Sequence, residues 1–266
     1  MGEGIDFRQL AEKLLELSKQ SVMRRKALLV YSPGEGDDYI AGIENDIVDL
    51  RSFLESPQGG LWTDIEVAAC PTRAILWAKV QILKPFEYSL VAFSGHGGTE
   101  SDGSTILDLG NGESIDANIL RTGSPKQTVI VDCCRAALER IQLSEKLAIG
   151  TAIPQLDDER CRKLYDSRIR DCPSPMLAVL NACQEGELAY AHAKTGSYYI
   201  QKLMACGEEW TRQRLLSDDN DGVLSVLGAH RRAEKKVIAE TGERQNPEIL
   251  IPKDGPYFPF CVAGWT

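Results

Sequence analysis

Short, nearly continuous apolar runs alternate with helical patterns along most of the chain. The runs are ALLVY from Ala27, DIEVAA from Asp64, YSLVAF from Tyr88, QTVIVD from Gln127 and PMLAVL from Pro175. Segments 43–56 (IENDIVDLRSFLES) and 72–83 (TRAILWAKVQIL) place apolar residues at helical spacing between them. Strands that are buried on both faces have this continuous apolar character. The alternation therefore predicts an α/β fold with a doubly wound, mostly parallel sheet and helices on both faces.

Charge and targeting signals limit the classes of partner. The 30 Lys and Arg residues against 39 Asp and Glu give a net charge of −9, which argues against nucleic acid or an anionic membrane as the main partner. The first twenty residues form a charged amphipathic pattern rather than the apolar core of a signal peptide. No run of 18 apolar residues occurs. We therefore expect a cytoplasmic protein whose eight cysteines stay reduced.

The sequence suggests a division into an extension and two unequal parts. Residues 1–26 form an N-terminal helical extension that could dock an activating partner or pack on the sheet. Its apolar residues lie at roughly helical spacing: Phe7, Leu10, Leu14, Leu15 and Leu17. Residues 27–141 form a larger part and 175–266 a smaller one. Between them, 142–174 is rich in charged residues and ends in Pro-Ser-Pro, which predicts an exposed linker.

His96 and Cys134 each follow an apolar run, at the strand ends where α/β proteins collect functional groups. A cysteine with an ordinary pKa of about 8.5 needs a base to become a nucleophile, and the only other histidines are His192 and His230. The glycines around His96 leave amides free, so the amides of Gly97 and Cys134 could bind an oxyanion. A buried structural cysteine and a histidine in a turn remain open alternatives at this point.

Two motifs resemble the catalytic pair of metacaspases and bacterial caspase-like peptidases. They are Ser94-Gly95-His96-Gly97 after LVAF, and Asp132-Cys133-Cys134 after TVIV. NACQEGELAYA, GERQNP and the ALLVYSP–IENDIVDL pair are also similar to segments of that family, so that the resemblance covers about residues 27–252. It implies a three-layer caspase-like fold and a cysteine endopeptidase of the C14 type, with His96 and Cys134 as catalytic dyad. Ala136 departs from the family's Gly or Ser after the nucleophile.

The resemblance also implies a substrate class. In metacaspases, the positions matching Asp46, Ser94 and Asp132 line the pocket for the residue before the scissile bond. Two carboxylates can hold a guanidinium through charge-assisted hydrogen bonds. We therefore expect protein or peptide substrates with Arg or Lys at that position, whereas true caspases hold an Asp. An Asp46 that merely caps or solvates a helix remains the alternative.

Two further expectations concern processing and metal ions. The basic residues of 142–174 would suit such a pocket, so the enzyme could process itself in this linker. No metal site and no cofactor are predicted, because the cysteines and histidines lack zinc spacing. Residues 218–222 (DDNDG) resemble part of a calcium loop but lack its final Glu. Some metacaspases need calcium, so calcium dependence stays open without a predicted site.

Two other functions compete with the peptidase. Cys134 and Arg140 match the C-x5-R spacing of phosphatases, but the intervening RAALE lacks the glycines of a phosphate-binding loop. The altered residues 135–137 also keep open a catalytically impaired binding or scaffold module with the same fold.

Overall fold

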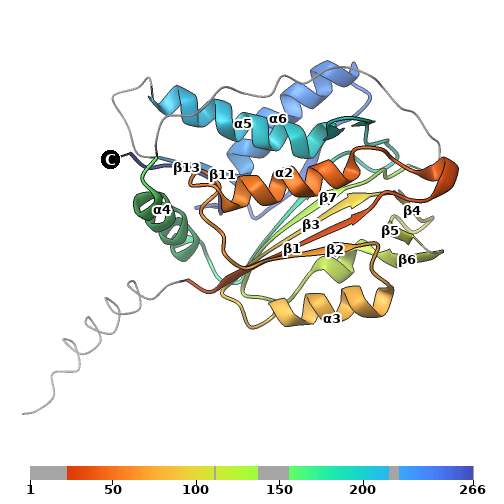
Figure 1. Ribbon diagram of the computed structural model, residues 1–266, viewed down its shortest axis with the longest axis horizontal. Helices are drawn as coiled ribbons and strands as arrows, with labels where there is room; N and C mark the ends of the chain where they lie inside the picture. Colours follow the sequence, from red (N-terminus) through yellow and green to blue (C-terminus); the bar gives the residue numbers. More distant parts are fainter. Residues whose placement is uncertain (1–22, 111, 137–155, 216–221, 266) are drawn as a thin grey trace, which may run out of the picture.

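A six-stranded sheet forms the middle layer of the molecule (Figure 1). The computed structural model describes residues 23–110, 112–136, 156–215 and 222–265. The strand order is β12-β8-β7-β3-β1-β2, and only β12 runs antiparallel to its neighbour. The strands are β1 (Arg25–Ser32), β2 (Ile65–Ala69), β3 (Tyr88–Gly95), β7 (Lys126–Asp132), β8 (Met176–Asn181) and β12 (Glu248–Leu250). The five predicted apolar runs are the five parallel strands.

Helices cover both faces of this sheet, as the sequence predicts (Figure 1). α2 (Ile43–Glu55), α5 (Tyr198–Leu215) and α6 (Val226–Thr241) lie on one face, and α3 (Arg73–Leu83) lies on the other. β1 shows why both faces are covered. Ala27 and Leu29 belong to the first core, whereas Leu28 and Val30 belong to the core that α3 closes, because successive side chains of a strand point to opposite faces.

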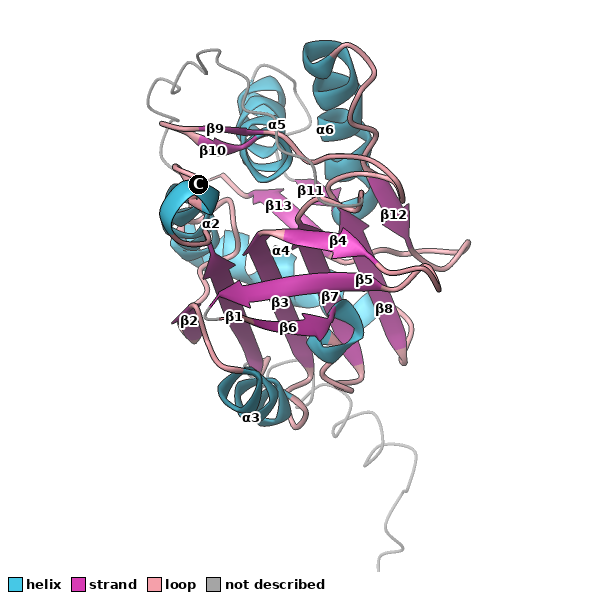
Figure 2. Ribbon diagram, turned by 90° about the vertical axis from the view of Figure 1, so that its right-hand side faces the viewer, coloured by secondary structure: helices cyan, strands magenta, loops and turns pink. Residues whose placement is uncertain are grey.

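Three small sheets and two short 3-10 helices complete the fold (Figure 2). The antiparallel sheet of β4 (Gly97–Thr99), β5 (Thr105–Gly110) and β6 (Glu113–Asp116) follows β3 directly. The other two sheets pair β9 (Ala191–His192) with β10 (Gly196–Ser197), and β11 (Gly222–Ser225) with β13 (Pro259–Ala263). The 3-10 helices are η1 (Gly36–Asp38) and η2 (Ala117–Leu120). Of these elements, η1, β4, β5 and the β9–β10 pair contribute residues to the candidate site.

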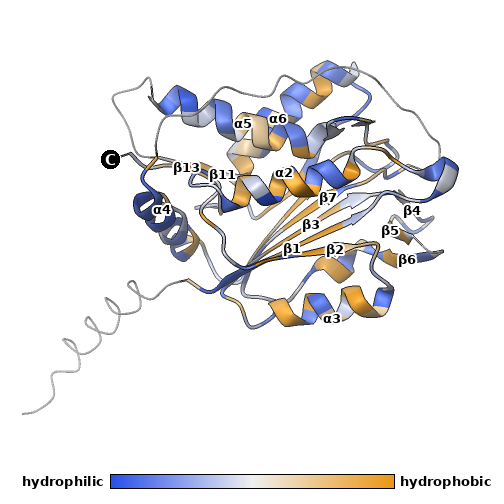
Figure 3. Ribbon diagram, in the orientation of Figure 1, coloured by the Kyte–Doolittle hydropathy of each residue, from blue (hydrophilic) through white to orange (hydrophobic). Residues whose placement is uncertain are grey.

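The prediction of an exposed linker over 142–174 is wrong for the second half of that segment. Residues 158–171 form helix α4 (Asp158–Asp171), which buries Cys161, Tyr165 and Ile169 in the core. These positions are four residues apart, so they form one helical stripe. The many charged residues around them obscure this pattern in the sequence, and Figure 3 colours most of α4 hydrophilic. Arg25 anchors the helix: it pairs with Asp166 (3.4 Å) and lies over the Tyr165 and Trp62 rings.

The sheet begins two residues before the expected boundary at Ala27. β1 begins at Arg25, so the last two residues of the expected N-terminal extension belong to the sheet. Residues 1–22 of that extension and 142–155 of the linker lie outside the described residues. In the described ranges, no helix has both the length and the apolar character that crossing a membrane would require.

Candidate active site

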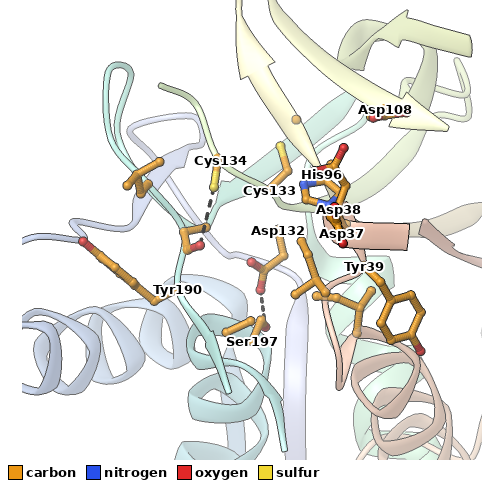
Figure 4. Close-up of a pocket in the computed structure, with 17 residues that line it drawn as sticks. Asp37, Asp38, Tyr39, His96, Asp108, Asp132, Cys133, Cys134, Tyr190 and Ser197 are labelled. Carbon is orange, nitrogen blue, oxygen red and sulfur yellow. Dashed lines mark hydrogen bonds between the residues drawn. The ribbon is translucent and has the colours of Figure 1, made fainter. Parts of the chain in front are cut away.

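The register of two neighbouring strands brings His96 and Cys134 to one edge of the sheet. β3 and β7 run parallel with Ser94 opposite Asp132, so that each residue lies two positions beyond this matched pair. Both line a cavity of 330 Å³ at the carboxyl end of the strands. Figure 4 shows His96 and Cys134 on two sides of this cavity, with Cys133 between them and Asp132 below in this view.

The His96 ring is held in a neutral state. Its Nε2 donates to the carbonyl oxygen of Asp38 in η1. Burial lowers the pKa of His96, while the carboxylate of Asp108 and the backbone of Pro33 oppose that shift. An imidazole that is neutral at neutral pH and has one nitrogen unprotonated can accept a proton. The residue therefore has the state that a general base requires.

Cys134 presents a partly buried thiol to the cavity. Its Sγ–H donates to the carbonyl oxygen of Ala189 at 3.5 Å. Burial raises the pKa of the Cys134 thiol, and the hydrogen bond with Ala189 opposes this only in part. The resting residue is thus a thiol rather than a thiolate. Within the described residues, the thiol and the imidazole are each bonded to a backbone carbonyl and not to one another, so the pair is not yet engaged.

The adjacent Cys133 is less suited to react. It is 2% exposed, and burial raises the pKa of its thiol well above the ordinary value. Its Sγ packs beneath Gly97, where an added Cβ would come within 2.6 Å of that sulfur and 2.8 Å of the Ile106 carbonyl oxygen. Cys133 therefore supports the start of β4, directly after His96.

Replacing Gly97 by Ala should reduce both stability and any activity of the site. The new methyl group would overlap Cys133 and the backbone of Ile106, so β4 would have to move together with His96. Gly98→Ala is the matched control, because its Cβ would approach only the carbonyl oxygen of Ala136, at 3.2 Å. Thermal melts and turnover of both variants should separate them. A Gly97→Ala variant that melts and turns over like Gly98→Ala would contradict the packing described.

The structure brings together the three residues expected to bind substrate. Asp46 accepts hydrogen bonds from the Ser197 amide (2.8 and 3.0 Å) and from Ser94 Oγ (3.0 Å). Asp132 accepts from Ser197 Oγ (2.5 Å) and from the Ile200 amide (3.2 Å). Ser197 thus links the two carboxylates. Asp132 lines the cavity, whereas Asp46 is 0% exposed and lies behind it.

Both buried carboxyl groups have raised pKa values, and the charge of Asp132 acts on Asp46. Burial raises the pKa of Asp132 to about 6, although the hydrogen bonds from Ser197 and Ile200 oppose the shift. Burial, and then the charge of Asp132, raise the pKa of Asp46 well above its ordinary value. No Lys or Arg lines the cavity among the residues that the structure describes. Closely spaced carboxyl groups without a cation form a site that a basic side chain can neutralise.

Sequence reasoning missed several residues of the cavity. They are Asp37, Asp38, Tyr39, Asp108, Tyr190 and Ser197. Asp37 and Asp38 follow the Ser-Pro-Gly that ends the first strand, which is a weak signal. No sequence signal marks Ser197, because β10 approaches Asp46 and Asp132 only through the tertiary fold. The other two histidines lie elsewhere: His192 is in β9, and buried His230 bonds to Tyr199.

Arg135 fixes the backbone just after Cys134. Its Nη1 pairs with Glu248 of β12 (2.9 Å) and donates to the Cys183 carbonyl oxygen (3.2 Å), and its Nε donates to Thr105 Oγ1 (3.1 Å). Arg135, the first of the altered residues 135–137, thus has a clear structural role. Arg140, on which the phosphatase alternative depends, lies outside the described residues.

The described ranges contain no group of three or more His, Cys, Asp or Glu residues arranged for a metal ion. Residues 218–221 of the calcium-like loop are outside those ranges.

A three-layer fold around a mainly parallel sheet, with a thiol and an imidazole on one cavity, defines an α/β protein with a cysteine–histidine site. A family model, the caspase domain of the C14 peptidases, matches residues 24–253, and the chain therefore belongs to the caspase family. Among solved structures, it is similar to caspase-1 from Spodoptera frugiperda, with a TM-score of 0.55 and 14% identity over 87% of this chain and 90% of that chain. No curated protein matches significantly. The findings support a caspase-like protease that acts on protein substrates.

Proposed function

We propose that the chain is a cysteine endopeptidase that cleaves after Arg or Lys, with Cys134 as nucleophile and His96 as base. The observation that supports this most is the common cavity of His96, Cys134 and Asp132. The family provides the peptidase fold, and the cavity provides a thiol, a neutral imidazole and a buried acid in one place.

The proposed mechanism follows from these groups. A substrate in the cavity displaces the thiol from Ala189 and the ring from Asp38, so that the unprotonated nitrogen of His96 removes the Cys134 proton. The thiolate attacks the carbonyl carbon, and the amides of Gly97 and Cys134 bind the oxyanion. The imidazolium then gives its proton to the leaving amine as the C–N bond breaks. Water, deprotonated by His96, hydrolyses the acyl-enzyme and restores the thiol.

The acidic cavity supports the preference for a basic residue. A guanidinium that reaches Asp132 meets a carboxylate already accepting two hydrogen bonds from protein donors, and Asp46 adds a second acid behind Ser197. Further carboxylates line the walls (Asp37, Asp38 and Asp108). An Asp side chain of a caspase substrate would instead meet like charges in a partly dry site, which is unfavourable.

The direct test compares peptides ending in Arg, Lys or Asp, beside a phosphotyrosine mimic. The proposal expects turnover of the Arg and Lys peptides only. Turnover of the mimic would support the phosphatase alternative. An unreactive protein that still binds Arg peptides would support the scaffold alternative. That alternative is favoured by the contacts of Cys134 and His96, which bond to the carbonyl oxygens of Ala189 and Asp38 and not to one another.

Cleavage after Arg should depend steeply on pH between about 5 and 7. The pKa of Asp132 is raised to about 6, so its carboxylate is lost as the pH falls through that value, and the attraction for Arg is lost with it. Burial lowers the pKa of His96, so at a given pH more of it is the neutral base than of an ordinary histidine. We expect kcat/KM for an Arg peptide to rise through an apparent pKa near 6 as the pH increases. A wild-type profile that is flat from pH 5 to 7, like that of Asp132→Asn, would contradict this role of Asp132.

Self-processing should take place early in the linker. The basic residues from Arg160 to Arg170 lie in α4, which is anchored to the core, and a protease needs an extended substrate. Lys146 is the remaining basic residue of 142–174. Intact mass after incubation should show a cut after Lys146 in the wild type and in Lys163→Gln, but not in Lys146→Gln or Cys134→Ala. A cut mapped within α4 would contradict this prediction.

A further inference from the structure

Helix α3 is apolar on the side that faces away from the sheet. Leu76, Val80 and Leu83 are buried beneath it. Three large apolar side chains nevertheless remain exposed: Ile75 (48%), Trp77 (55%) and Ile82 (53%). A helix that is apolar around most of its circumference is normally covered on more than one side. The outer side of α3 therefore has the character of an interface.

The outer side also has the shape that receives a helix. Ala74 and Ala78 are exposed and lie four residues apart, so they form one row on the surface. Ile75 and Ile82 flank this row on one side, and Trp77 and the exposed Gln81 flank it on the other. A row of small residues between larger side chains is a groove into which the ridge of a second helix packs. The charged Lys79 is turned aside to pair with Glu66 of β2.

The chain enters the described structure beside this helix. Arg24 donates from Nη2 to the Pro85 carbonyl oxygen (2.9 Å) and from its amide to Glu87 (2.8 Å). Pro85 follows the last residue of α3 by two positions. The described chain therefore begins beside the loop that follows α3.

That segment has a complementary pattern. Residues 1–22 lie outside the described residues, but their sequence places Phe7, Leu10, Leu14 and Leu17 at intervals of three and four. This spacing puts the four on one stripe of a helix, with charged residues on the other side. Such a helix has a single apolar face, which needs a single apolar partner.

We propose that residues 6–21 form a helix that packs on the outer side of α3, with the leucine stripe over Ala74 and Ala78. The two helices run parallel, because both end at the edge of the sheet where β1 begins. A helix of this length spans about 24 Å and α3 about 16 Å, so the first covers the whole second. The N-terminal segment thus adds a second helix to the face of the sheet on which α3 is the one described α-helix (Figure 1).

The test uses the full chain and a matched pair of variants. Leu14→Asp places a carboxylate in the stripe, and Gln9→Asp places one in the same segment but on its polar side. Hydrogen exchange should show protection of 6–21 and 73–83 in the wild type and in Gln9→Asp, and loss of protection in both segments in Leu14→Asp. Acrylamide quenching of Trp77, isolated as the difference from Trp77→Phe, should increase only in Leu14→Asp.

Two results would overturn the proposal. Trp77 could be equally accessible in wild type and Leu14→Asp, which would leave α3 uncovered by its own chain. Alternatively, protection of Trp77 could rise with protein concentration, together with a larger sedimentation coefficient, which would make a second copy the occupant. The reciprocal variant Ile82→Asp should release 6–21 while peptide turnover stays at the wild-type level, because α3 contributes no residue to the cavity.

Discussion

The Cys134→Ala variant should lose peptidase activity by a factor on the order of 10⁴ or more, as enzymes do when a catalytic nucleophile is removed. Cys134 lines the cavity with His96, and its thiol is the group that would form the acyl-enzyme. Alanine leaves the fold intact, since the thiol makes one hydrogen bond, to the Ala189 carbonyl oxygen. Turnover of an Arg-ending peptide, with active-site titration of the wild type, measures the loss.

The neighbouring thiol provides the control. Cys133→Ala removes a buried sulfur that packs under Gly97, so it should lower the melting temperature and leave most of the turnover. Circular dichroism and melting of both variants separate folding from chemistry. If Cys133→Ala abolishes activity in a folded protein while Cys134→Ala retains it, the nucleophile has been assigned to the wrong thiol.

The Asp132→Asn variant should lose cleavage after Arg by roughly 10²- to 10³-fold in kcat/KM, which corresponds to removing one partner of a buried charged pair. The amide keeps the size of the side chain and can still accept from Ser197 Oγ and the Ile200 amide, but it carries no charge. The loss should fall on Arg and Lys peptides, whereas the slow reaction of a peptide with a neutral residue should change little.

The melting temperature of Asp132→Asn and the turnover of a second variant, Asp108→Asn, distinguish a loss of specificity from misfolding. Burial raises the pKa of Asp132 to about 6 in the folded protein, above its ordinary value of 3.8. The folded protein therefore favours the protonated form, and this acid destabilises the fold as the pH rises through this range. Asp132→Asn should therefore melt no lower than the wild type at pH 7.5. Asp108→Asn, on another wall of the cavity, should affect all peptides alike. A uniform loss in Asp132→Asn would argue against a specificity role.

The sequence was sufficient to predict the elements that place the two reactive residues. The apolar runs around Leu90 and Val129 are strands because only a sheet buried on both faces requires them to be apolar at every position. Placing His96 and Cys134 at one edge then follows from parallel strand direction alone. That part of the prediction depends on local patterns and one topological rule.

Other features depend on contacts between distant segments and could not be predicted. Ser197 joins Asp46 to Asp132 across 151 and 65 residues of sequence, and no local pattern encodes such a contact. The sequence of α4 looks like a linker because its buried stripe has only Cys161, Tyr165 and Ile169 among charged residues. A buried Arg25 that stacks on Tyr165 is also exceptional, so no sequence pattern predicts it. The contacts of the thiol and imidazole with Ala189 and Asp38 likewise depend on side-chain conformation.

Covalent labelling with a peptidyl arginyl chloromethyl ketone tests the central claim most directly. Such a reagent places an electrophile where the scissile carbonyl of an Arg substrate would lie, so it alkylates the thiol that His96 activates. The account predicts one adduct per chain, mapped to Cys134 by peptide mass spectrometry, and much slower labelling by the aspartyl analogue and in Asp132→Asn. Labelling of Cys133, or equal labelling by the arginyl and aspartyl reagents, would contradict it.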